Sequence, residues 1–258
     1  MTDSANQPSP AESEDAVKKP YSLWLGLGGA LLGFLLPYAA GNGLSYLLMA
    51  LGVQELASGV DLFFSSVSFA LAVVLFVTFA GKWKTVRDFL SLRNFHWKHL
   101  ILAAVSAIAL YAIAIFLGVI SWKISESTGI SLGENQTTQK ISDAVGSATF
   151  VLVSLVAALT APLVEELFFR GALLSSLVQE KASKLLKIGS VIFVGALFGW
   201  FHTQGFDGSL ASWMAMLVPA VVGAWCATLT LKTKSIYPAI ITHMLYNSIV
   251  LLSVAGLL

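Results

Sequence analysis

Residues 144–164 read AVGSATFVLVSLVAALTAPLV, a run of 21 residues that contains no charged side chain. A helix needs about 20 apolar residues to cross the hydrocarbon core of a bilayer. The run ends at Glu165, but the apolar character continues through Glu166 and Arg170 to about Gln179. The pattern predicts one long membrane helix with polar groups in its second half.

Six further uncharged stretches have a similar length. They cover residues 22–53, 62–81, 99–122, 188–206, 208–231 and 235–258. The 258-residue chain is 57% hydrophobic and 11% charged, which is too apolar to cover a soluble globule with polar surface. We therefore predict an all-α, polytopic membrane helix bundle with about seven transmembrane helices. Eight helices are the alternative, because Pro37 or residues 41–43 could divide the first stretch.

The basic residues indicate the orientation, because positively charged loops stay on the cytoplasmic side of a membrane. If the N-terminus is cytoplasmic and the helices alternate, Lys123 and Lys140 lie outside and Arg170 lies in the membrane. The other twelve of the fifteen basic residues then fall inside: Lys18, Lys19, Lys82, Lys84, Arg87, Arg93, Lys98, Lys181, Lys184, Lys187, Lys232 and Lys234. We expect a multi-pass integral protein of a bacterial cell membrane, with lipid around it. The net charge of +1 gives no electrostatic reason to expect a nucleic-acid partner.

Composition divides the chain into three parts within one membrane domain. Residues 1–20 are rich in Ser, Glu, Asp and Pro and have few large apolar side chains, so we expect a disordered cytoplasmic tail. Residues 21–143 are expected to form structural transmembrane helices, because their apolar stretches carry no charged groups. Residues 144–258 hold the polar groups and are expected to be a catalytic transmembrane core.

Five ionisable side chains lie inside the apolar stretches of that core, where an unpaired charge costs several kcal/mol. They are Glu165, Glu166, Arg170, His202 and His243. On a helix, Glu166 and Arg170 are four residues apart and can form an ion pair. Glu165 points about 100° away from Glu166 and is left for a different partner.

Two of these side chains and one further polar residue lie on other predicted helices. His202 lies toward the outer half of the stretch 188–206, and His243 and Asn247 are one helical turn apart on the last stretch, 235–258. A rise of about 1.5 Å per residue places all of them at a depth similar to that of Glu165. A carboxylate, two imidazoles and an amide in a dry cavity could activate water and stabilise an oxyanion, which is the chemistry of peptide hydrolysis.

These residues form three ordered motifs: Glu165-Glu166-x-x-x-Arg170-Gly171, Phe198-x-x-x-His202 and His243-x-x-x-Asn247. Together they resemble the motifs of the CAAX protease and bacteriocin-processing family (CPBP, or Abi) of intramembrane endopeptidases. The resemblance covers residues 148–250 and implies a peptide or membrane-protein substrate.

The resemblance also implies a role for each residue. Glu165 would activate the attacking water with the help of His202. Glu166 would orient the site through His243, and Arg170 would hold the glutamate pair. His243 and Asn247 would stabilise the oxyanion.

Cofactor use stays open in the sequence. The favoured mechanism needs no cofactor, but Glu165, His202 and His243 could bind a divalent metal such as zinc. The His-Glu-x-x-His motif of many zinc proteases is absent.

Two other functions are compatible with the composition. A proton- or solute-coupled transporter also places ionisable groups in the membrane, but it predicts two matched halves, and no repeat is seen. A non-catalytic scaffold or immunity protein of the same fold is the other alternative.

Overall fold

The structure is a computed structural model, and it describes residues 23–80, 90–92, 95–130, 145, 150–178, 182–203 and 209–258. The predicted tail, residues 1–20, lies outside the described residues, as does Lys140. All the regular structure in the described residues is helical, which confirms the predicted fold class.

The helices follow the apolar stretches closely. The first three are α1 (Leu23–Ala50), α2 (Gln54–Ala80) and α4 (Lys98–Thr128). The last three are α9 (Lys184–Phe201), α10 (Leu210–Thr233) and α11 (Tyr237–Val254). Between them, residues 150–177 form a helical segment with two π-helical parts: α6 (Phe150–Leu155), η1 (Val156–Thr160), α7 (Ala161–Glu166), η2 (Leu167–Leu174) and α8 (Ser175–Leu177).

Each of the seven predicted stretches has a helical counterpart. Within the described residues, five helices are long and apolar enough to cross a membrane: Gly28–Ala50, Lys98–Thr128, Lys184–Phe201, Leu210–Thr233 and Tyr237–Val254. Helix α2 adds a shorter apolar stretch, Phe63–Phe76. The chain is thus a multi-pass membrane protein.

The structure rules out the alternative of a divided first stretch and corrects the end of one predicted helix. Helix α1 runs without interruption through Pro37 and residues 41–43, so the first stretch does not divide into two spans. A proline interrupts only local backbone bonds, and a long helix can continue past it. The predicted span 188–206 also ends early, because α9 stops at Phe201 and His202 is the residue that ends the helix.

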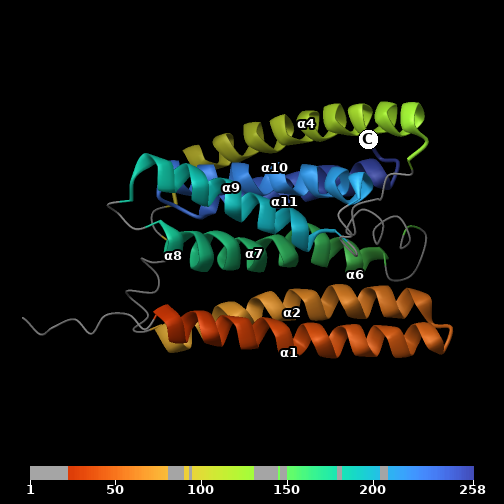
Figure 1. The fold of residues 1–258 in the computed structure, drawn as a ribbon, viewed down its shortest axis with the longest axis horizontal. Helices are drawn as coiled ribbons and strands as arrows, with labels where there is room; N and C mark the ends of the chain where they lie inside the picture. Colours follow the sequence, from red (N-terminus) through yellow and green to blue (C-terminus); the bar gives the residue numbers. More distant parts are fainter. Residues whose placement is uncertain are drawn as a thin grey trace, which may run out of the picture.

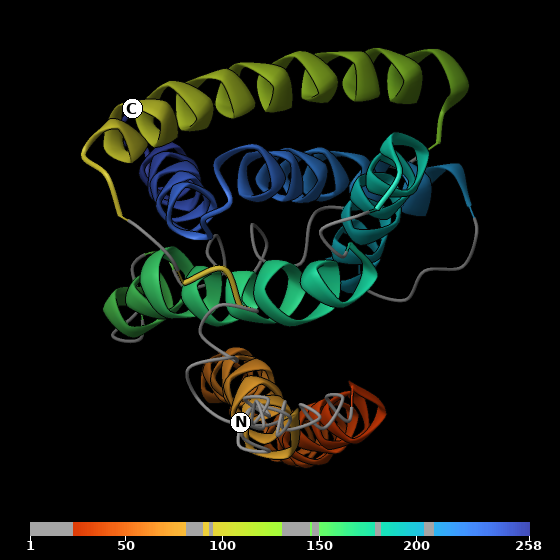
Figure 2. The same cartoon turned by 90° about the vertical axis from the view of Figure 1, so that its left-hand side faces the viewer.

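The 150–177 segment lies at the centre of the bundle (Figures 1 and 2). Helices α1 and α2 form a hairpin, and α2 packs against one side of this segment. Helices α9, α10 and α11 lie on its other side, and α4 covers α11 and α10 as the outermost layer. Helices α1 and α2 therefore lie on one side of the C-terminal helices, and α4 lies on the opposite side.

Glycines allow α9 and α10 to approach closely. A Cβ atom added to Gly199 would lie 2.6 Å from the carbonyl oxygen of Met216, and one on Gly195 would lie 2.9 Å from that of Ala220. Gly223 on α10 faces α9, and a Cβ atom added to it would lie 2.9 Å from Cβ of Phe198. Small residues at such contacts are typical of packed membrane helices. This close contact brings the backbone of α10 to the centre of the bundle.

Candidate active site

A buried ion pair joins Glu166 and Arg170. Nη1 of Arg170 lies 2.8 Å from Oε1 of Glu166, and both side chains are fully buried. The two residues are one helical turn apart, at the junction of α7 and η2. The predicted pair is confirmed. In the low dielectric of the bundle, each charge is compensated by the other.

Arg170 also contacts α9 and α10. Its Nη2 atom donates a hydrogen bond of 2.8 Å to the carbonyl oxygen of Gly223, and its guanidinium lies 4.7 Å from the centre of the Phe198 ring. The aromatic face and the carbonyl both present negative charge to the cation. Arg170 therefore connects the central segment to both neighbouring helices, and the glycine at position 223 permits this approach.

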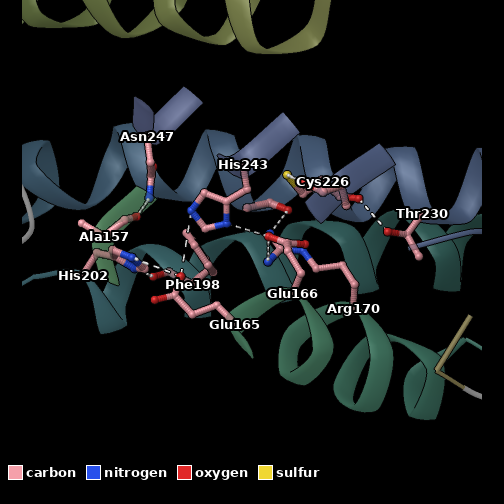
Figure 3. Close-up of polar contacts among 12 residues, drawn as sticks. Ala157, Glu165, Glu166, Arg170, Phe198, His202, Cys226, Thr230, His243 and Asn247 are labelled. Atoms are coloured by element: carbon pink, nitrogen blue, oxygen red, sulfur yellow. Dashed lines mark hydrogen bonds and ion pairs between the residues drawn. The ribbon is translucent and has the colours of Figure 1, made fainter. Parts of the chain in front are cut away.

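Glu166 fixes the ring of His243. Nδ1 of His243 lies 2.9 Å from Oε1 of Glu166, the same oxygen that Arg170 binds (Figure 3). A carboxylate paired with an arginine can only accept, so the imidazole is the donor in this contact and Nδ1 carries the hydrogen. In the neutral ring, Nε2 is then an acceptor.

A backbone carbonyl holds His202 in the same tautomer as His243. Its Nδ1 atom donates to the carbonyl oxygen of Phe198 at 2.8 Å, and a carbonyl can only accept. The His202 ring also stacks on the Phe198 ring with centroids 4.3 Å apart. Nε2 of the neutral His202 ring is therefore also an acceptor.

The two Nε2 atoms both face Glu165. Oε2 of Glu165 lies 3.7 Å from Nε2 of His202 and 3.9 Å from Nε2 of His243. These distances are too long for direct hydrogen bonds but suit groups that share a small polar molecule. Glu165 is largely buried, with a side chain that is 12% exposed. Three acceptor atoms from three parts of the chain thus converge at one point.

Asn247 lies one turn beyond His243 on α11 and contacts the central segment at a different place. Its Nδ2 atom donates a hydrogen bond of 2.8 Å to the carbonyl oxygen of Ala157 in η1. One of its two amide hydrogens is therefore already committed to the backbone. The second hydrogen and Oδ1 remain for other contacts.

The C-terminal part of the chain matches a known protein family. Residues 147–249 match the family model described as type II CAAX prenyl endopeptidase Rce1-like, and this range includes every residue of the site. The chain carries an Rce1-like domain. No curated protein and no solved structure is a significant match to the chain.

The site contains the carboxylate and imidazole atom types that a zinc ion requires. Imidazole nitrogens anchored through the opposite ring atom are usual for metal ligands, as in His202 and His243. However, no group of three His, Cys, Asp or Glu side chains in the described residues is placed to hold a metal ion. We therefore derive no step through a metal.

The structure brings together the residues that the sequence singled out. Glu165, His202 and His243 meet at one point, and Glu166 and Arg170 lie directly behind them. Asn247 lies four residues after His243, but its observed partner is the backbone carbonyl of Ala157.

The sequence analysis did not identify three backbone carbonyls that accept hydrogen bonds from side chains of the site, because any residue can supply a carbonyl. They belong to Ala157, Phe198 and Gly223. Only weak signals pointed to them: Pro162 inside an apolar helix, and the Gly195-x-x-x-Gly199 spacing.

Proposed function

We propose that the protein is an intramembrane endopeptidase in which Glu165 activates a water molecule for attack on a peptide bond. The observation that carries this proposal is the convergence of Oε2 of Glu165 with the Nε2 atoms of His202 and His243. All three are acceptors, so the molecule that best satisfies them is one that donates hydrogens. A water held there keeps a lone pair for attack on a carbonyl carbon.

In the first step, Glu165 takes a proton from the water as the oxygen attacks the carbonyl carbon. His202 would hold the second hydrogen of the water through Nε2. The protonated Glu165 can then pass its proton to the leaving nitrogen, so that the base is regenerated. The developing oxyanion would be stabilised by the free amide hydrogen of Asn247.

Glu166 and Arg170 would act by fixing this arrangement. Their charges compensate each other, and Oε1 of Glu166 sets the ring of His243. The substrate is proposed to be a peptide or membrane protein cut near the membrane, because the site is enclosed by membrane helices. A C-terminal prenylated peptide is the natural first substrate to test, given the family model.

We propose that the N-terminus lies in the cytoplasm. The C-terminal ends of α2 and α10 and the N-terminal ends of α4, α9 and α11 lie at one end of the bundle (Figure 1). Among the described residues, the terminal turns at this end contain the lysines Lys98, Lys184, Lys187, Lys232 and Lys234, whereas Lys123 lies near the other end of α4. Lysines accumulate on the cytoplasmic side of membrane proteins.

The function is tested with purified protein and the variant Glu165→Ala. Both are incubated with a library of C-terminal peptides, prenylated and unprenylated, and of transmembrane peptides, and products are identified by mass spectrometry. We expect the parent to cut a subset of the peptides and the variant to cut none. Glu126→Ala, at an exposed position of α4, is the control. Equal cutting by Glu165→Ala and the parent would show that Glu165 is not the base.

A further inference from the structure

The carbonyl of Ala157 has lost its usual helical donors. In η1, the backbone N–H of Ala161 bonds to the carbonyl of Val156, five residues earlier. In the same pattern, the carbonyl of Ala157 would receive the N–H of residue 162. That residue is Pro162, which has no N–H. Ala157 is 2% exposed, so water does not replace the missing donor.

Asn247 supplies the missing hydrogen bond. Its Nδ2 atom donates to the Ala157 carbonyl at 2.8 Å, across 90 residues of sequence. Figure 3 shows Asn247 directed from α11 toward Ala157, next to His243 on the same helix. A backbone carbonyl that is free inside a helical segment is rare, and here it lies opposite a residue of the site. Single π-helical turns inside α-helices are frequently found at functional sites.

We propose that Pro162 is a positioning residue of the active site. By withholding a backbone N–H, it leaves the Ala157 carbonyl free to orient the amide of Asn247. The orientation of this amide decides where its second hydrogen points, one helical turn from His243 on α11. The catalytic part of this inference rests on the proposed function, but the structural link among Pro162, Ala157 and Asn247 does not.

The structural link is tested by thermal unfolding of the full-length protein in detergent. Pro162→Ala, Asn247→Ala and the double variant are compared with the parent. Proline-to-alanine replacement raises helix propensity equally in both backgrounds, so this effect cancels in the comparison. In the Asn247→Ala background, the new N–H at position 162 satisfies a carbonyl that has no partner. In the parent, it only competes with Asn247.

We therefore compare the change in Tm that Pro162→Ala causes in each background. This change should be more favourable in the Asn247→Ala background than in the parent, by roughly 2–4 °C. The control is Pro219→Ala, which changes another buried proline inside a helix, α10. Its effect on Tm should be the same with and without Asn247. Equal effects of Pro162→Ala in the two backgrounds would overturn the proposal.

Kinetics test the catalytic part on a peptide that the parent cuts. We expect Pro162→Ala to lower kcat about tenfold with little change in KM, because it disturbs an orientation and not substrate binding. In the Asn247→Ala background it should cause no further loss. A further tenfold loss there would show that Pro162 does not act through Asn247.

Two outcomes separate this inference from the proposed function. If the parent cuts no peptide, the proposed function fails, but the Tm comparison still decides whether Pro162 and Asn247 are coupled. If Pro162→Ala does not fold, Asn247→Leu replaces it, because leucine has a similar size and cannot donate to the Ala157 carbonyl. Retention of the parent kcat by Asn247→Leu would overturn the proposal, and a loss of about tenfold would support it.

Discussion

Nδ1 of His243 lies 2.9 Å from Oε1 of Glu166, and this contact joins α11 to the central segment inside the membrane. The same oxygen accepts from Arg170 at 2.8 Å, so one atom compensates a charge and also sets the tautomer of an imidazole. Glu166 is fully buried and lies behind His243 as seen from Glu165. Its position suits a residue that orients the site without touching the substrate.

Replacing Glu166 by glutamine should therefore lower kcat and leave KM nearly unchanged. Glutamine keeps the size but removes the charge that holds Nδ1 of His243, and the loss of such an orienting carboxylate should lower kcat roughly 10–100-fold. Steady-state kinetics of Glu166→Gln measure both constants. Glu126→Gln, at an exposed position of α4, is the matched control. An increase in KM with unchanged kcat would assign Glu166 to substrate binding.

Arg170 should matter more for stability than for the chemical step. Arg170→Met leaves the carboxylate of Glu166 buried without its ion partner, at a cost of about 3–5 kcal/mol in the free energy of unfolding. The double variant Glu166→Leu, Arg170→Met removes both charges and should regain most of the stability, but not activity, because His243 has lost its partner. Unfolding by denaturant in detergent gives these free energies. A double variant no more stable than Arg170→Met would contradict this account.

The contact between α9 and α10 should tolerate no Cβ atom at Gly199. An alanine there would place Cβ 2.6 Å from the carbonyl oxygen of Met216, so the helices must separate. We expect Gly199→Ala to lower Tm by several degrees and to reduce activity, because His202 follows α9 directly. Gly189→Ala on the same helix meets nothing within 4 Å and is the control. It should keep activity and stability, since alanine is the better helix former. Equal Tm values for the two variants would show that the contact is adaptable.

Metal chelation should leave the activity unchanged if glutamate-activated water is the nucleophile. The parent is assayed with and without 1,10-phenanthroline, and again after addition of Zn²⁺. Full loss of cleavage with chelator and recovery with Zn²⁺ would replace the proposed mechanism with a zinc-dependent one. Glu165→Ala should then also bind less zinc, which elemental analysis of the purified protein would detect.

The sequence alone determined the approximate positions of the helices of this protein. Hydropathy is a local property, because each apolar stretch must satisfy its own backbone within lipid. The ion pair of Glu166 and Arg170 was also predictable, since a spacing of four residues places both on one face of a helix. The motif order then indicated which polar residues belong together.

Only the tertiary structure decided which atoms meet. The carbonyls of Ala157, Phe198 and Gly223 bind Asn247, His202 and Arg170, respectively, and a carbonyl carries no signature in the sequence. The Ala157 carbonyl lies in the π-helical turn η1, just before Pro162, and the Gly223 carbonyl lies where α9 and α10 pack closely. Such contacts join residues that are far apart in the chain, so they follow from packing and not from local pattern.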